Sequence, residues 1–260
     1  IIQEYPDEFP KIIGARNSTD VEKISILKKI ITSLKSPLLK PYGDTFYYLP
    51  HVRKKISELK REYVAPNDFF RFVREQKKEL ADIPDLRHER GVSAGEIKGK
   101  YARIAKQIEW SAEFFHVYRD YEKELIKKRL YDYEDMITET VRALLENKEL
   151  LLRLQEEHQY ILADEHQDAN RSQNRLLELL ASFHENPNLF IVGDEKQAIY
   201  RFQGASLENF LYFKRLYPES LIVTLEENYR STQTLLDAAH SLALHGSGPR
   251  ELRVRPRAFR

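Results

Sequence analysis

The chain has 260 residues, which is enough for one or two domains with a sizeable hydrophobic core. Its 42 basic and 41 acidic residues leave a net charge of +1. The overall charge therefore does not indicate the kind of partner, and only local clusters of charge can do so. The chain has no cysteine, which excludes disulfides and cysteine-ligated metal sites and fits a cytoplasmic protein, and no apolar run approaches the roughly 18 residues that span a membrane.

Residues 1–130 are predicted to be mostly helical. Thr19 and Glu22 form the pattern of a capping box, and apolar residues recur behind them at helical spacing as far as Leu34. Further helices are expected over about 51–62, after Pro66, and from Ile97 to Leu125.

The pattern changes after Tyr131. Short β-prone runs occupy residues 160–163, 189–192 and 221–225. Helices are expected between them, one over about 176–183 and one near 207–216. Strands that alternate with helices favour parallel βαβ units, so the predicted fold class is α/β.

Two acidic residues, Asp164 and Glu165, directly follow the first of these predicted strands. Ligands of open α/β sheets bind beyond the carboxyl ends of the strands. A carboxylate there can hold Mg²⁺ on a nucleotide, and its neighbour can accept a proton from an attacking water. The alternative is an acidic pair in a solvated loop, which the following Gln167 and Asp168 make less attractive.

The second predicted strand leads into a segment rich in polar and aromatic residues, from Gly193 to Ala205. Within it, Gln197 is a candidate for contacting a γ-phosphate. Tyr200, Arg201 and Phe202 could form a stacking platform for single-stranded bases, worth about 1–3 kcal/mol per base. Taken alone, Phe202 is as well explained by a core aromatic at a helix start.

The third predicted strand leads to Glu226 and Glu227, followed by Asn228, Tyr229 and Arg230. Arg230 could act as an arginine finger on a triphosphate, and Tyr229 could stack on adenine. Without further context, an ion pair of Arg230 with a neighbouring Glu is the simpler interpretation.

Taken in order, these segments resemble the UvrD/PcrA/Rep family of superfamily-one DNA helicases. The resemblance covers roughly residues 131–240, and it is carried by Asp164-Glu165-His166-Gln167-Asp168, the Gly193 to Ala205 segment, Asn228-Tyr229-Arg230-Ser231 and the upstream Tyr131-Asp132-Tyr133-Glu134-Asp135-Met136. Departures from the family pattern are His166, where an aromatic residue is usual, and Ala163, where Val is usual.

The resemblance implies an ATP-dependent helicase with ATP and Mg²⁺ as cofactors and single-stranded DNA and duplex junctions as partners. It implies that Asp164 holds Mg²⁺, Glu165 activates water and Gln197 contacts the γ-phosphate. The roles implied for the remaining site residues are DNA coupling by Tyr200, Arg201 and Phe202, adenine stacking by Tyr229 and a γ-phosphate contact by Arg230.

The resemblance also implies a domain layout. Residues 1–130 correspond to a helical insertion, 131–217 to the second half of a first RecA-like P-loop motor domain, and 218–260 to the start of a second motor domain with a basic tail. No Gly-x-x-x-x-Gly-Lys-Ser/Thr phosphate loop occurs, since the stretch from Gly95 to Lys100 has the wrong spacing and no hydroxyl after its Lys. Because the chain also opens on Ile1 rather than Met, we expect a fragment that is inactive by itself.

Basic residues in the helical part are candidates for contacts with DNA phosphates, although solvated helix faces explain them equally well. They are Arg53, Lys54, Lys55, Lys60, Arg61, Arg71, Arg74, Lys77, Lys78, Lys98, Lys100, Arg103 and Lys106. Two other functions stay open: the motor of an AddA/RecB-like helicase-nuclease, and a non-catalytic DNA-binding module.

Overall fold

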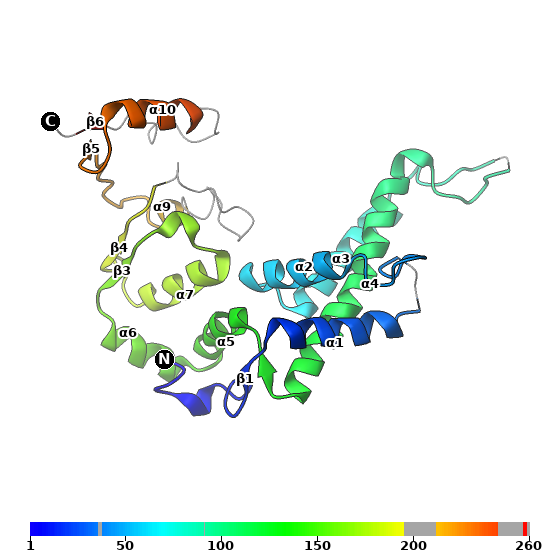
Figure 1. The fold of residues 1–260 in the computed structure, drawn as a ribbon, viewed down its shortest axis with the longest axis horizontal. Helices are drawn as coiled ribbons and strands as arrows, with labels where there is room; N and C mark the ends of the chain where they lie inside the picture. The colour runs from blue at the N-terminus through cyan, green and yellow to red at the C-terminus, as the bar shows by residue number, and fades with distance from the viewer. Residues whose placement is uncertain (36–37, 91, 195–211, 244–256, 259–260) are drawn as a thin grey trace. The chain divides into compact units, whose positions relative to one another are not determined.

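The computed structural model describes residues 1–35, 38–90, 92–194, 212–243 and 257–258 (Figure 1). The chain divides into two compact units, Ile1–Ala143 and Leu144–Arg260. Within the described residues, no helix combines the length and apolar character needed to cross a membrane.

The first unit is built from helices. Its elements are η1 (Pro6–Glu8), β1 (Arg16–Asn17), α1 (Asp20–Ser33), α2 (Leu49–Arg61), α3 (Pro66–Ala81), α4 (Gly99–Lys127), β2 (Leu130–Tyr131) and α5 (Tyr133–Glu146), whose last residues belong to the second unit. The predicted capping box is confirmed, because the Thr19 side chain accepts from the backbone N–H of Glu22 and the Glu22 carboxylate accepts from that of Thr19. The helices expected in residues 1–130 all form, with ends within a few residues of those predicted.

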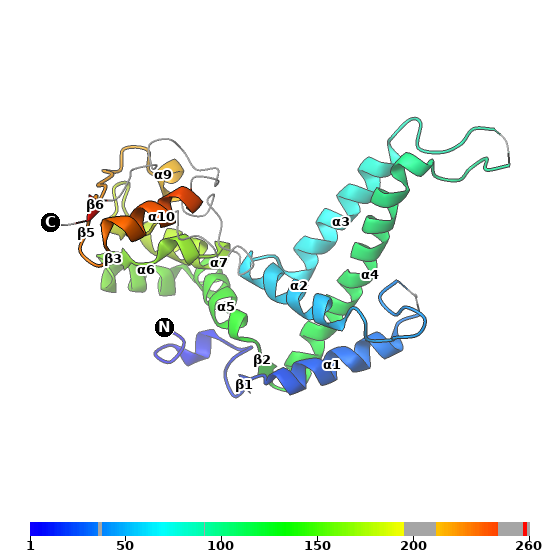
Figure 2. The ribbon, with the colours of Figure 1, turned by 45° about the horizontal axis from the view of Figure 1, so that its top comes forward.

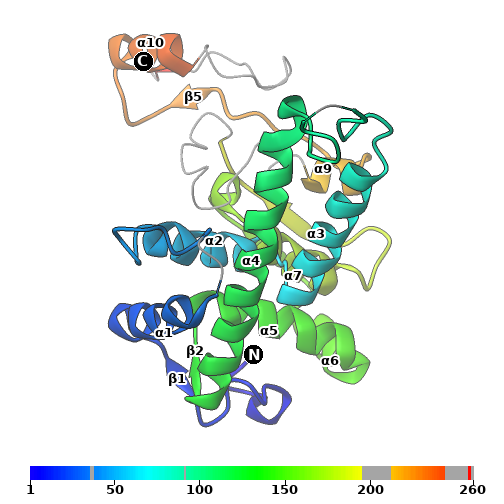
Figure 3. The same ribbon diagram turned by 90° about the vertical axis from the view of Figure 1, so that its right-hand side faces the viewer.

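The long helix α4 organises this unit. Helix α3 runs antiparallel beside it (Figure 2), and α1 packs along its C-terminal half (Figure 3). The core between these helices contains fully buried apolar side chains, among them Leu27, Ile31, Val52, Phe114 and Leu125. The edge-to-face pair of Phe69 and Phe114 fixes how α3 sits on α4.

A buried ion cluster joins α2, α4 and the start of α5. The ammonium group of Lys60, only 3% exposed, lies 2.6–2.9 Å from one oxygen of each of three carboxylates, those of Glu122, Asp132 and Asp135. A second ammonium group, that of Lys11, lies 2.8 Å from Glu122 and 3.0 Å from Asp135. Burial alone would lower the pKa of Lys60, but the surrounding carboxylates raise it well above its ordinary value, so Lys60 is charged.

The second unit contains the predicted βαβ arrangement. Its elements are α6 (Lys148–Glu157), β3 (Ile161–Ala163), η2 (His166–Asp168), α7 (Arg171–Ala181), β4 (Leu189–Ile191), α9 (Tyr212–Leu216), β5 (Glu227–Asn228), α10 (Gln233–Ala243) and β6 (Arg257–Ala258). Strands β3 and β4 are parallel, and Ala163 pairs with Ile191 at the end of the ladder. The α/β class is therefore confirmed. Among the described residues, the strands form separate short parallel pairs.

One predicted strand is wrong. Residues 221–225 have no regular secondary structure, and the strand that follows them, β5, begins only at Glu227. The side chains of Leu221, Val223 and Leu225 are largely exposed, so this β-prone run has neither a partner strand nor a core to cover it within the described residues. β propensity reflects packing against neighbours, which explains why composition alone misled the prediction.

Candidate active site

The two carboxylates of the candidate site lie where the sequence predicts them, immediately after β3. Asp164 and Glu165 are both exposed, so either can meet a ligand from solvent. One oxygen of Asp164 accepts the backbone N–H of Glu165 at 2.8 Å. Glu165 has a left-handed backbone with φ of 49°, which turns the chain sharply between β3 and η2.

The residues after the carboxylates anchor this turn to the neighbouring strand. The backbone N–H of His166 donates to the carbonyl of Val192 at 3.0 Å. The side chain of Gln167, 2% exposed, donates through Nε2 to Glu165 and accepts the backbone N–H of Asp194 at 3.0 Å. The ends of β3 and β4 are thereby joined directly beside the carboxylates.

His166 fills a buried position under the site. It is 1% exposed, and its ring lies edge-to-face against Phe213 at 5.4 Å between centroids. Neither ring nitrogen has a hydrogen-bond partner among the described residues. Burial lowers the pKa of His166, so the ring is a neutral, aromatic-like packing group in the place where the family pattern has an aromatic residue.

The Gly193 to Ala205 segment, called the third-motif segment from here on, lies only partly within the described residues. Gly193 and Asp194 emerge from β4 at the same edge as Asp164, because β3 and β4 are parallel and in register. Gln197, Tyr200, Arg201 and Phe202 lie outside the described residues, and their roles stay predictions.

The segment Asn228-Tyr229-Arg230-Ser231 is arranged by a local turn. The Asn228 side chain accepts the backbone N–H groups of Arg230 at 2.9 Å and Ser231 at 2.8 Å, an Asx turn that leads towards α10. Tyr229 is 76% exposed and Arg230 is also exposed. Both side chains are accessible from solvent, and the Asx turn of Asn228 shapes the backbone that carries them.

A second acidic group, formed by Glu122, Asp132 and Asp135, brings carboxylate oxygens within 4.8 Å of one another. The ammonium groups of Lys60 and Lys11 already pair with all three carboxylates at hydrogen-bonding distance. This cluster is therefore a structural ion network and not a cation site.

The buried Lys60 also corrects the predicted set of phosphate-binding residues, because its ammonium group is enclosed by carboxylates and cannot reach DNA. Several other members of that set are paired with acids, such as Arg61 with Glu134 and Lys100 with Asp85. The members of that predicted set that are exposed and have no ion pair among the described residues are Arg74, Lys77, Lys78, Arg103 and Lys106.

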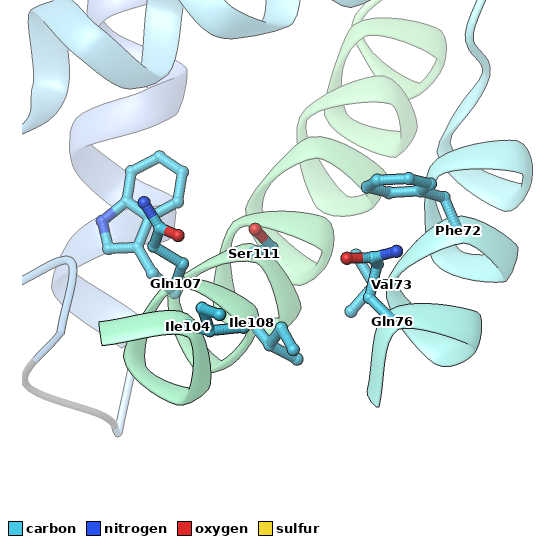
Figure 4. Close-up of a pocket in the computed structure, with 8 residues that line it drawn as sticks. Phe72, Val73, Gln76, Ile104, Gln107, Ile108 and Ser111 are labelled. Carbon is cyan, nitrogen blue, oxygen red and sulfur yellow. The ribbon is translucent and has the colours of Figure 1, made fainter. Parts of the chain in front are cut away.

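A groove of about 390 Å³ lies between α3 and α4 in the helical unit (Figure 4). Phe72 and Gln76 line it from α3, and Gln107, Ile108 and Ser111 line it from α4. None of the residues that line this groove is titratable, so it lacks the groups needed for acid–base or metal chemistry.

The sequence analysis assigned no role to Gln167, whose side chain joins the two strand ends beside the carboxylates. The signal was present, since Gln167 stands two positions after Glu165 within the motif, but a side chain that bridges two strand ends cannot be inferred from spacing alone.

The comparisons with known proteins identify the family of the chain. The chain belongs to the UvrD/REP helicase N-terminal domain family, which it matches over residues 18–218. This confirms the predicted resemblance to UvrD/PcrA/Rep helicases.

Individual relatives are named as DNA helicases. The ATP-dependent DNA helicase PcrA of Bacillus subtilis (strain 168) is 41% identical over 131 residues, which is 50% of this chain and 18% of that protein. The proteins of the same name from Staphylococcus aureus (strain Mu50 / ATCC 700699) and Staphylococcus epidermidis are each 40% identical over 131 residues, with the same coverage. The chain therefore matches only a small part of the length of these curated relatives.

Proposed function

We propose that this chain is part of an ATP-dependent DNA helicase that couples ATP hydrolysis to movement on single-stranded DNA and to unwinding at duplex junctions. The observation that carries the proposal is the pair of exposed carboxylates after β3, held beside the start of the third-motif segment by Gln167. Membership of a helicase family supports the same conclusion.

The residues present fit a magnesium nucleotide. Asp164 is an exposed carboxylate at the carboxyl end of a parallel strand, and only one of its oxygens is engaged by the neighbouring backbone. Mg²⁺ prefers oxygen ligands and keeps several waters, so one carboxylate is sufficient. Asp164 would hold the ion, which neutralises charge on the β- and γ-phosphates when bound.

Glu165 is proposed as the general base. It follows Asp164 directly, is exposed, and has its carboxylate held by Gln167. A base in this position accepts the proton of the water that attacks the γ-phosphate, a contribution of typically about 10²–10⁴-fold.

The other roles complete the proposed cycle. Gln197 contacts the γ-phosphate. The presence or absence of that phosphate is coupled to single-stranded DNA by Tyr200, Arg201 and Phe202. The exposed Tyr229 stacks on adenine, and Arg230 reaches the γ-phosphate from the second motor domain.

We retain the predicted domain layout as part of this proposal: a helical insertion over 1–130, a RecA-like motor half over 131–217, and the start of a second motor domain over 218–260. The 260 residues include no glycine-rich phosphate loop. We therefore propose that they do not hydrolyse ATP by themselves, and the cytoplasmic location stays a prediction from the sequence.

The test is the ATPase activity of the protein expressed from its complete reading frame, measured with and without single-stranded DNA. We expect DNA-stimulated turnover that Glu165→Gln lowers by at least about 100-fold, while nucleotide binding is retained. Unchanged turnover in Glu165→Gln would contradict the assignment of the base. Absence of DNA-stimulated turnover in the wild type would favour a non-catalytic DNA-binding module, and turnover by the 260 residues alone would contradict the proposed inactivity.

A further inference from the structure

Gln167 uses both ends of its side-chain amide, and this fixes which way the amide faces. Its Oε1 accepts the backbone N–H of Asp194, and a backbone N–H can only donate. The NH₂ group must therefore face Glu165, whose carboxylate can only accept when ionised. The hydrogen-bond network thus sets a single orientation of Gln167.

Gln167 and Glu165 differ in how firmly they are held. Gln167 is 2% exposed on η2, and the backbone around it is tied to the end of β4. Glu165 is exposed, and an exposed Glu samples several rotamers. The amide of Gln167 restricts that freedom, because it gives the Glu165 carboxylate a fixed donor.

The other end of the bridge reaches the third-motif segment. Asp194 lies three positions before Gln197, the residue proposed to contact the γ-phosphate. The two hydrogen bonds of Gln167 therefore connect the backbone at the start of this segment to the carboxylate of Glu165 through a single side chain.

We propose that Gln167 is a positioning residue that orients the general base Glu165 and ties its position to the segment that contacts phosphate and DNA. The inference rests on the proposed function, since it assumes that Glu165 activates water. It assigns a role to a residue that does not itself touch the reacting atoms.

Gln167→Glu removes the hydrogen bond of Gln167 to Glu165 and keeps its hydrogen bond to the backbone of Asp194. The new side chain has the same shape and keeps an acceptor for the backbone N–H of Asp194, but it presents an oxygen instead of an NH₂ group to Glu165. A matched control is Gln155→Glu in α6. Gln155 is 6% exposed and donates to the Leu179 carbonyl at 2.7 Å and to the Ser182 hydroxyl at 3.1 Å, so it suffers the same loss of a buried donor without contacting Glu165.

The experiment measures DNA-stimulated ATP hydrolysis by the protein from the complete reading frame, together with the affinity for a fluorescent ATP analogue. We expect Gln167→Glu to lower kcat by about 10- to 100-fold, because misplacing a catalytic group by about 1 Å has an effect of this size. KM for ATP and the analogue affinity should stay within about twofold of wild type, and Gln155→Glu should retain kcat.

A double-mutant cycle distinguishes positioning from a general structural role. In a Glu165→Gln background, single-turnover hydrolysis should show no further loss on adding Gln167→Glu, because the group that Gln167 orients is already gone. The proposal is overturned by a kcat for Gln167→Glu within about threefold of wild type, by an equal loss in Gln155→Glu, or by an undiminished loss in the Glu165→Gln background.

Two further controls distinguish failure of this proposal from loss of folding and from failure of the proposed function. If Gln167→Glu does not fold, Gln167→Met removes the donor without adding charge, and failure of both variants to fold would make the role of Gln167 structural and overturn the proposal. Full activity of Glu165→Gln alone would instead contradict the proposed function, whatever Gln167→Glu does.

Discussion

Lys60 shows how strongly the surroundings of one residue can change its role. In the sequence it stands among exposed basic residues of a helix, yet it is 3% exposed and surrounded by the carboxylates of Glu122, Asp132 and Asp135. Burial alone would raise the pKa of Asp132, but Lys60 and the hydroxyl of Ser18 lower it to about 2. The charges of this cluster therefore depend on one another.

Lys60→Met should destabilise the chain by about 3–5 kcal/mol, because it leaves buried carboxylates without their central cation. The free energy of unfolding, measured by urea denaturation of the 260-residue chain, tests this. Lys78→Met on the exposed face of α3 is the control and should change stability by less than about 0.5 kcal/mol. Equal stability of the two variants would show that the cluster contributes little.

His166 is predicted to make stability depend on pH. Its folded-state pKa is lowered by burial, so the unfolded chain binds the proton more readily. The contribution of neutral His166 is fully present above about pH 6.5, the ordinary histidine value, and is lost as the pH falls from there towards the lowered pKa of the folded state.

In His166→Phe this loss should disappear, because phenylalanine cannot be protonated. The difference between the unfolding free energies of variant and wild type should grow by on the order of 1 kcal/mol between pH 8 and pH 5. Denaturation at a series of pH values measures it, with His184→Gln at an exposed position as the control. A difference that does not change with pH would contradict a buried neutral imidazole.

At the scale of elements, local signals predicted most of the helices. The capping box at Thr19, Pro66 at a helix start and the apolar spacing of α4 each specify structure within a few residues of chain. Strands were harder to predict, because a strand forms only beside a partner strand, and the local sequence does not indicate which segment that partner is. The pairing of β1 with β2 joins Arg16 to Leu130, and no local pattern indicates it.

Thr19→Ala tests how much one such local signal contributes. The variant loses the side-chain acceptor for the N–H of Glu22, and should lower the free energy of unfolding by about 1 kcal/mol. Thr19→Ser keeps the hydroxyl and should stay close to wild type in the same denaturation measurement. A Ser variant as unstable as the Ala variant would attribute the effect to packing of the methyl group instead.

At the scale of the whole molecule, the candidate site was only partly predictable. The carboxylates Asp164 and Glu165 could be located because a strand end and a motif coincide there. The bridge through Gln167 depends on the register of β3 against β4, a relation between segments separated by a helix, and only the folded chain reveals it.

The two units also differ in how their apolar side chains are covered, and this predicts unequal local stability. The first unit has a continuous core in which Leu27, Phe114 and Leu125 are completely buried. In the second, Leu162 on β3 is 75% exposed and Phe190 on β4 is 62% exposed. Segments with few buried apolar contacts open at lower free energy than the core of a domain.

Hydrogen exchange of the 260-residue chain should therefore be slowest in the buried part of α4 and clearly faster in β3 and β4. Mass spectrometry of peptides after deuterium labelling measures this, with residues 221–225, which are exposed and have no regular secondary structure, as the fast reference. Leu125→Ala in α4 removes a completely buried side chain and should accelerate exchange throughout the core of the first unit, since such truncations cost about 2–5 kcal/mol. Slower exchange in β3 and β4 than in α4 would mean that the parallel pair, and with it the carboxylate site, is held by more than the short ladder and the Gln167 bridge.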